Sequence, residues 1–314
     1  MYNKKIYIAS HGGLLGSAIL KLLKLKGFKK LVTKPERDLD LTSQDAVCKF
    51  LRKERIEYVF LSTGASCGIV ANQKYPATLL EENLAIQSNF FKAAQKYEIK
   101  KLIFFGSSCM YPRDCRQPIK EEYLMTGPLE KTSQAYALTK ILGIEACRAY
   151  NEEFGTNRFV ALVPNSIYGP NDEFDPDKSH VIAALIRKLF EARRKNKKFV
   201  TLWGTGNPVR EFVFSEDVAS ASIFAAMNSH KFENTHYNIA SGHSYSIRQI
   251  AEIISKITKF RGEIHWDKTK PDGARKKILD GSKLFGLGWR PSTSLESGIK
   301  ITCDWYSDSF NKKI

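Results

Sequence analysis

Two residues four positions apart, Tyr136 and Lys140, have the chemistry to protonate a carbonyl oxygen. On a helix, residues at i and i+4 share a face, so this spacing predicts that the Lys140 ammonium lies beside the Tyr136 ring. A neighbouring cation favours phenolate and lowers the pKa of a tyrosine from about 10. Such a tyrosine can protonate an oxygen that gains charge during hydride transfer. The pair indicates ketone reduction, but its spacing is common on helices, so a cofactor site must support it.

A hydroxyl and a thiol follow a strand-like run elsewhere in the chain. Ser107, Ser108 and Cys109 come directly after the apolar segment 101–106. The Ser107 hydroxyl can hold the same oxygen that the tyrosine protonates. A lone cysteine after a strand is otherwise a small buried hydrophobe, so Cys109 by itself is ambiguous.

The N-terminal segment predicts a dinucleotide site. A short buried strand over 4–9 leads into a glycine-containing turn and then into a helical pattern. Glycines in such a turn let the backbone approach a pyrophosphate at a helix N-terminus. The predicted cofactor contacts are Ser10, Gly13, Leu14, Leu15 and Gly16. Ser10 stands where the fingerprint has its first glycine, and an ordinary strand-to-helix turn is the alternative.

Two cations after the second predicted strand favour NADP over NAD. Lys34 and Arg37 follow the segment 29–33, where basic side chains can bind a 2′-phosphate. A solvated loop in a lysine-rich protein is the alternative interpretation.

Alternation of strands and helices predicts an α/β fold, a Rossmann-type doubly wound parallel sheet. The predicted strands are 4–9, 29–33, 57–62, 101–106 and 158–163, and the predicted helices are 15–27, 43–54, 78–97 and 135–154. Functional sites of such sheets lie at the carboxyl ends of the strands. Gly13, Ser107 and Pro164 all follow a strand, so one crevice is expected to collect them.

The pattern becomes less regular beyond residue 165 and predicts a smaller C-terminal lobe. A helix is expected over 180–196, an extended segment over 198–214, and a helix near 215–229 that returns to the first domain. We expect residues 1–165 plus about 210–240 to form the cofactor domain. Residues from about 166 to 209 plus 241–314 are then the substrate-binding lobe.

Composition limits the class of protein. The 314 residues are 43% hydrophobic and 11% aromatic, which is typical of a globular chain. The formal net charge of +16 is spread along the sequence without the dense basic tracts of a dedicated nucleic-acid surface, so no nucleic-acid partner is predicted. We expect a cytoplasmic enzyme, since no apolar run or signal-like N-terminus is apparent. The six scattered cysteines suggest neither a metal site nor disulfides.

Several short blocks, taken in order, resemble the GDP-L-fucose synthase group of the extended short-chain dehydrogenases/reductases. They are GIVAN at 68–72, SSCMYP at 107–112, YALTK at 136–140, YGP at 168–170, SHVI at 179–182, WGTG at 203–206, REF at 210–212 and KPDG at 270–273. The resemblance covers nearly the whole chain.

This resemblance implies a GDP-4-keto-6-deoxy sugar that is reduced at C4 by NADPH and epimerised at C3 and C5. By the same resemblance, Cys109 removes protons and His180 returns them from the opposite face. Lys140 holds the nicotinamide ribose as well as acting in reduction, and Tyr136, Pro164 and His180 also bind the cofactor. The implied GDP-sugar contacts are Lys188, Trp203, Arg210 and Asp272. Trp203 alone could equally be a core residue. A homodimer through the helices 78–97 and 135–154 is also implied.

Other activities remain open to different degrees. The nearer alternative is a C4 reductase of a GDP-heptose, with little or no epimerisation. The identity of the sugar stays open because Cys67 stands where the group usually has a glycine. A 4,6-dehydratase needs a carboxylate where Ser108 and Cys109 stand, and a UDP-galactose-type 4-epimerase has no need of a Cys109/His180 pair. A non-catalytic Rossmann protein that binds a nucleotide or RNA is a distant alternative.

Overall fold

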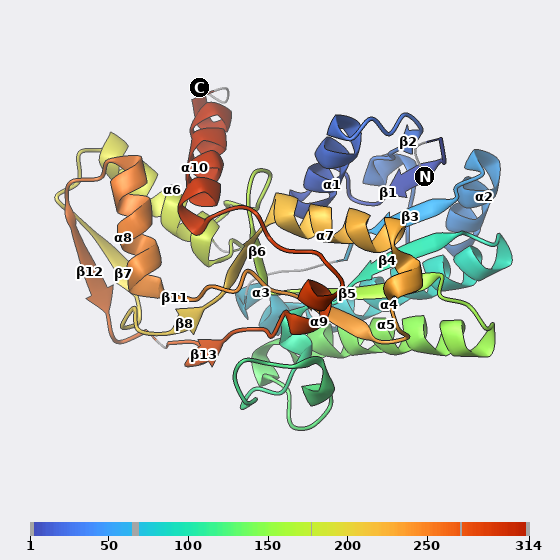
Figure 1. The fold of residues 1–314 in the computed structure, drawn as a ribbon. Coiled ribbons are helices and arrows are strands. Elements are labelled where there is room, and N and C mark those ends of the chain that lie inside the picture. Colours follow the sequence, from blue (N-terminus) through green and yellow to red (C-terminus); the bar gives the residue numbers. More distant parts are fainter. Residues whose placement is uncertain (1–2, 65–68, 177, 271, 312–314) are drawn as a thin grey trace.

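A parallel sheet of six strands forms the centre of the larger domain (Figure 1). The structure is a computed structural model that describes residues 3–64, 69–176, 178–270 and 272–311. The sheet order is β10-β5-β4-β3-β1-β2. The strands are β1 (Ile6–Ile8), β2 (Leu31–Val32), β3 (Tyr58–Leu61), β4 (Lys101–Phe105), β5 (Phe159–Pro164) and β10 (His236–Ile239). Because β2 and β3 pair with opposite edges of β1, the order in which strands are added to the sheet reverses there. Ligands of such sheets bind at this kind of switch point.

Helices cover both faces of the sheet, so its strands are buried on both sides (Figure 1). One face packs against α1 (Leu14–Leu25) and α7 (Ser215–Met227). The other packs against α2 (Gln44–Glu54), α4 (Pro76–Lys96) and α5 (Gln134–Glu153). Successive residues of a strand alternate between these two cores: Ile103 of β4 joins the first, and Leu102 and Phe104 join the second. The predicted Rossmann-type fold is confirmed.

The sixth strand, β10, is absent from the sequence-based prediction. Its residues include His236 and Asn238, whose polar side chains would be costly to bury without partners. The Tyr111 hydroxyl supplies those partners, since it lies 3.0 Å from His236 Nε2 and donates to Asn238 Oδ1 at 2.6 Å. Burial also lowers the pKa of His236 to about 4, so the ring is neutral. Tyr111, remote in sequence, therefore helps β10 to bury these two polar side chains.

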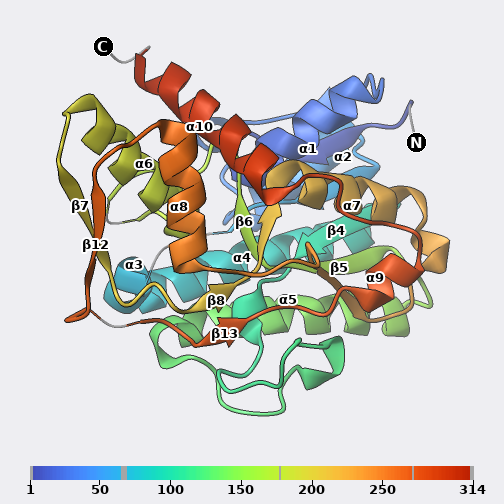
Figure 2. The same cartoon turned by 60° about the vertical axis from the view of Figure 1, so that its left-hand side comes forward.

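The smaller lobe packs around its own apolar core, beside the sheet (Figure 2). It contains α6 (Val181–Arg194), α8 (Ile247–Thr258), α10 (Leu295–Asn311) and the parallel pair β7 (Phe199–Trp203) and β12 (Glu263–Asp267). A three-stranded sheet of order β11-β8-β13 lies below, formed by Tyr245–Ser246, Val209–Arg210 and Lys276–Lys277. The helices expected over 180–196 and 215–229 are present as α6 and α7.

One strand joins the two parts. In β9 (Phe212–Phe214), which pairs with β6 (Ser166–Tyr168), Phe212 and Phe214 enter the lobe core while Val213 enters the core under α7. The segment assigned to the lobe also returns to the sheet, because Leu279, Leu284 and Trp289 belong to the cores of the larger domain. The chain therefore crosses between the two parts more often than the division expected from the sequence implies.

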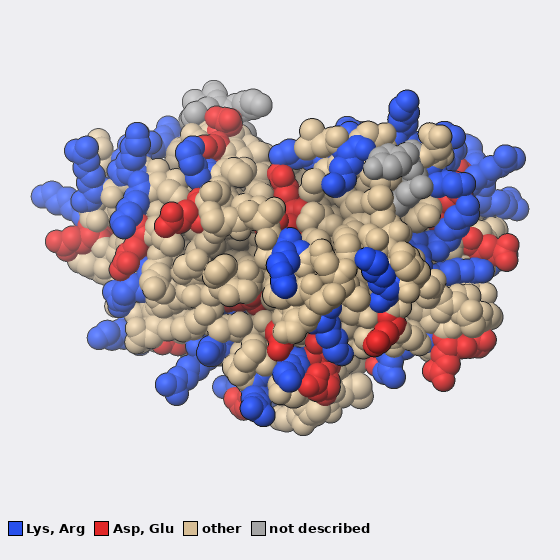
Figure 3. Space-filling model, in the orientation of Figure 1, with Lys and Arg blue, Asp and Glu red and all other residues tan. Residues whose placement is uncertain are grey.

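In the described part of the chain, no helix has the length and apolarity needed to cross a membrane. Lysine and arginine side chains are spread over the face shown in Figure 3, with acidic side chains among them.

Candidate active site

The turn between β1 and α1 brings the backbone of Ser10 against the first helical turn. Ser10 has φ of 49°, in the left-handed region that costs an L-residue roughly 1–2 kcal/mol. Its carbonyl accepts a hydrogen bond from Gly13 N at 3.0 Å, and its hydroxyl donates to Thr63 Oγ1 at 3.1 Å. Ser10 thus adopts a backbone conformation that a glycine would adopt more easily. Its hydrogen bond to Thr63, just after β3, helps to hold it there.

The start of α1 has the properties of a diphosphate site. Gly13 is the N-cap, and among the described residues no side chain caps this helix and no acidic residue lies in its first turn. Its leading N–H groups are therefore available, and the helix dipole favours an anion there. The residues fit a dinucleotide, which Gly13, Leu14, Leu15 and Gly16 would hold through their backbone.

Gly16→Ala should lower the free energy of unfolding by about 1–3 kcal/mol, the usual range for overpacking. A Cβ at Gly16 would lie 2.2 Å from the Ser10 carbonyl oxygen, which belongs to the backbone and cannot swing away. Gly12→Ala is the matched control, because nothing lies within 4 Å of its Cβ position. Urea unfolding of both variants measures the difference, and equal stabilities would contradict this account of the turn.

Lys34 and Arg37 lie just beyond the carboxyl end of β2. Arg37 is in the short 3₁₀ helix Glu36–Asp38, is strongly exposed, and has its Nε 3.7 Å from Asp38 Oδ1. Exposed cations at this edge can meet a phosphate, and their selection of NADP stays a prediction.

The thiol of Cys109 lies in a short turn after β4, within reach of a lysine. Ser107 caps the 3₁₀ helix Ser108–Met110 and its Oγ accepts from Cys109 N at 3.4 Å. Lys277 Nζ lies 3.7 Å from Cys109 Sγ. Burial acts to raise the pKa of this thiol, but the Lys277 charge and bonds from Ser107, Lys277 and Ser133 outweigh it, so the pKa is lowered. The thiol therefore loses its proton more readily than an ordinary cysteine does.

Tyr136 and Lys140 lie on α5, which packs against the turn that carries Cys109. Lys140 Nζ is 5.6 Å from the centre of the Tyr136 ring, as the i to i+4 spacing predicts. Both residues are buried, and burial lowers the pKa of Lys140 to about 8. At neutral pH the lysine is thus still mainly a cation beside the phenol.

His180 and Pro164 occupy the ends of two other elements. Pro164 is the last residue of β5, beside Ile239 of β10. His180 is the exposed N-cap of α6, and within the described residues its side chain makes no capping bond. A role for either residue toward cofactor or substrate stays a prediction.

The lobe presents Trp203 to solvent with two lysines beside it. In β7, Val200 and Leu202 point into the core, so strand alternation turns Trp203 outward and leaves it 62% exposed. Lys188 Nζ and Lys270 Nζ each lie 5.7 Å from the centre of a Trp203 ring. The alternative that Trp203 is a core residue is wrong.

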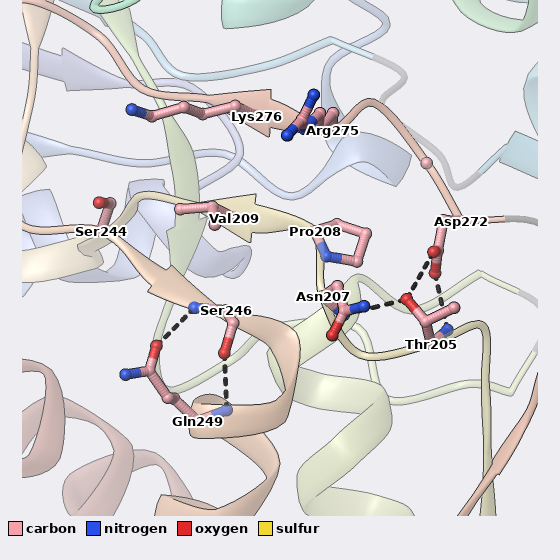
Figure 4. A pocket seen from close by; sticks show the side chains of 11 residues that line it. Thr205, Asn207, Pro208, Val209, Ser244, Ser246, Gln249, Asp272, Arg275 and Lys276 are labelled. Atoms are coloured by element: carbon pink, nitrogen blue, oxygen red, sulfur yellow. Dashed lines mark hydrogen bonds between the residues drawn. The ribbon is translucent and has the colours of Figure 1, made fainter.

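Arg210 and Asp272 lie near one another across the neighbouring loop. A Cβ on Gly273 would be 3.0 Å from Arg210 Nη2. The Asp272 carboxylate accepts from Thr205 N at 2.9 Å and from Thr205 Oγ1 at 2.6 Å, bonds that lower its pKa (Figure 4). A cavity of ≈ 780 Å³ opens beside Asp272 and runs toward Ser246 and Gln249. The residues expected to contact a GDP-sugar thus gather into two neighbouring groups on the lobe, Lys188 with Trp203 and Arg210 with Asp272.

Sequence reasoning missed Lys277, Ser133 and the buried carboxylate of Glu211. Lys277 is one of many lysines and lies 168 positions from Cys109, so no spacing rule connects them. Glu211, with no exposed surface, accepts hydrogen bonds from Asn165 Nδ2 at 2.8 Å and from Leu279 N at 2.9 Å. The sequence signal for Glu211 was an acidic residue directly before the apolar strand Phe212–Phe214. Cys67 lies outside the described residues.

Comparison with known proteins identifies relatives of this arrangement. Residues 6–240 match the model of the NAD dependent epimerase/dehydratase family. GDP-L-fucose synthase 1 of Arabidopsis thaliana is 44% identical over 96% of this chain and 93% of its own length. GDP-L-fucose synthase of Escherichia coli is 40% identical over 98% of each chain. The solved structure of a GDP-mannoheptose C4 reductase from Campylobacter jejuni, with NADP bound, superposes with a TM-score of 0.88 at 37% identity, over 98% of this chain and 99% of that one.

Proposed function

Because this chain belongs to the NAD-dependent epimerase/dehydratase family, we propose that it uses NADPH to reduce the C4 ketone of a GDP-4-keto-6-deoxy sugar and that it epimerises C3 and C5. The observation that supports this proposal most directly is a packing contact at the carboxyl end of β4. There, a cysteine next to Lys277 lies in a turn that packs against the helix bearing Tyr136 and Lys140. A base and a phenolic acid in one place suit both parts of this reaction.

The epimerisation half of the reaction uses the acidity of carbons next to a ketone. Cys109, as thiolate, removes a proton from C3 or C5, and negative charge moves to the C4 oxygen. His180 then returns a proton from the opposite face, which inverts the centre.

The reduction half uses the residues on and beside α5. NADPH supplies the hydride when bound. Tyr136 donates its phenolic proton to the C4 oxygen, Ser107 orients that oxygen, and the Lys140 cation keeps the phenol acidic. Lys34 and Arg37 would hold a 2′-phosphate, and the backbone of α1 a diphosphate.

The lobe would hold the GDP portion. The exposed Trp203 ring can stack on guanine or on a sugar face, with the Lys188 ammonium beside it. Arg210 can neutralise the diphosphate, and Asp272 can accept a hydrogen bond from the nucleotide.

A second candidate function, C4 reduction of a GDP-heptose with little or no epimerisation, is supported by the likeness to the heptose reductase. It uses the same Tyr136 and Lys140. The two functions differ in whether Cys109 reaches a proton of the sugar.

Incubation with GDP-4-keto-6-deoxy-D-mannose and NADPH in deuterated water separates these functions. NADPH oxidation is followed by absorbance, and deuterium at C3 and C5 of the product by mass spectrometry and NMR. Oxidation with deuterium at both carbons is expected. Oxidation without deuterium would leave a plain C4 reductase, and no turnover would contradict this substrate and direct the assay to 4-keto heptoses.

The rate of reduction should decline as the pH rises through about 8. The pKa of Lys140 is about 8, so its ammonium is present below that pH and lost above it. Since the acidity of Tyr136 depends on this cation, kcat/KM for NADPH oxidation should follow it. Lys140→Arg keeps the charge and should move the decline to higher pH, at a reduced maximal rate. The same midpoint in both proteins would exclude Lys140 as the titrating group.

We also propose a homodimer and a cytoplasmic location. Leu138 and Leu142, which share a face of α5, are 41% and 51% exposed, as a helical interface between two copies would require. Sedimentation velocity tests the dimer. The use of NADPH and a nucleotide sugar supports the location, which fluorescence microscopy of a tagged chain can test.

A further inference from the structure

Lys277 approaches the active-site thiol from a different part of the chain. It is the last residue of β13, which runs parallel to β8 and places Lys277 beside Arg210. Its Nζ lies 3.7 Å from Cys109 Sγ, within hydrogen-bonding distance for sulfur. The preceding residue, Lys276, is exposed, and strand alternation points it to the opposite face.

The backbone of Lys277 is held firmly in place. Its carbonyl accepts from Glu211 N at 3.3 Å and from Asn165 Nδ2 at 3.4 Å. The Glu211 carboxylate in turn binds Asn165 and the backbone of Leu279, on the far side of Lys277. A buried carboxylate accepting several hydrogen bonds is a rigid anchor. Lys277 is therefore positioned by the fold, with only its side chain free to move.

The other groups that interact with the sulfur carry no full positive charge. Ser107 and Ser133 offer hydroxyls from the turn and from the start of α5. A second cation, Lys140 on α5, has its Nζ near the rings of Tyr136 and Phe104. Lys277 is thus the cation that contacts the thiol directly, and an opposite charge at this range favours an ionised group.

We propose that Lys277 is the positioning residue that keeps Cys109 as a thiolate, ready to take a proton from the carbon beside the substrate's ketone. In that step the sulfur gains the proton, the C–H electron pair forms the enolate, and the charge goes to the C4 oxygen. The role of the thiolate as a base rests on the proposed function. Stabilisation of the thiolate by Lys277 does not depend on that function. Arg210, next to Lys277, suggests a competing role in binding the diphosphate.

The alkylation rate of Cys109 by iodoacetamide, measured against pH by mass spectrometry of its peptide, tests the proposal without any substrate. Lys277→Met should lower the rate at pH 7 by about tenfold or more and shift the profile to higher pH. Lys277→Arg should restore most of the rate. Lys276→Met, the matched control, removes one charge from the opposite face and should leave the profile unchanged.

An unchanged profile in Lys277→Met, confirmed as folded by circular dichroism, would overturn the proposal. If that variant instead only raised KM for the GDP-sugar, Lys277 would be a diphosphate ligand. In deuterated water with substrate, the proposal expects the kcat for exchange at C3 and C5 to fall with the alkylation rate. Failure of the sugar to react with the parent protein would count against the proposed function alone, since the alkylation profile stands apart from it.

Discussion

Tyr136→Phe should lower the rate of NADPH oxidation by about two to four orders of magnitude, the usual contribution of a general acid. The variant lacks only the phenolic proton that would go to the C4 oxygen, while the Lys140 cation stays beside the ring. Because the thiol lies on a separate turn, deuterium uptake at C3 and C5 should remain detectable. Stopped-flow absorbance and NMR of the recovered sugar measure the two quantities on one sample.

Tyr150→Phe is the matched control for this variant. Tyr150 lies on the same helix, packed against Phe91 and Phe159, and loses the same hydroxyl. It should oxidise NADPH at nearly the parent rate. Near-normal oxidation by Tyr136→Phe would show that another group protonates the oxygen and would remove the reductase role from this residue.

Cys109→Ser should have the reverse effect, with exchange at C3 and C5 reduced by about 10²–10⁴-fold and oxidation of NADPH retained. A serine hydroxyl ionises far less readily than a thiol, so the Lys277 charge is insufficient to make it a base. The ketone would then be reduced without inversion, and the product would be a different 6-deoxy sugar. Chromatography and NMR of the GDP-sugar distinguish the two products.

Cys115→Ser provides the comparison for this second variant, because Cys115 is also free and partly buried. Burial raises the pKa of its thiol, in contrast to Cys109. It should leave exchange intact. If Cys109→Ser still placed deuterium at both carbons, the base would have to be another residue.

Features that depend on local sequence were predictable. The i to i+4 spacing placed Lys140 beside Tyr136, and the strand-to-helix turn of Ser10 to Gly16 formed as expected. Helical periodicity and buried strands act over a few residues, so the alternation that defines a Rossmann-type sheet can be recognised before any contact is known. The block at 107–112 likewise indicated a site at the end of β4.

Features that depend on distant partners were decided by the tertiary structure. β10 needs the hydroxyl of Tyr111 to bury its polar side chains, and Trp203 is exposed because Val200 and Leu202 fill the lobe core. The environment of Cys109 depends on Lys277, which the carboxylate of Glu211 and the pairing of β13 with β8 bring to the sulfur. The sequence alone therefore determined which residues could do chemistry. Folding decided which cation lies beside the thiol and lowers its pKa, because electrostatic interactions depend on separation in space and not on separation along the chain.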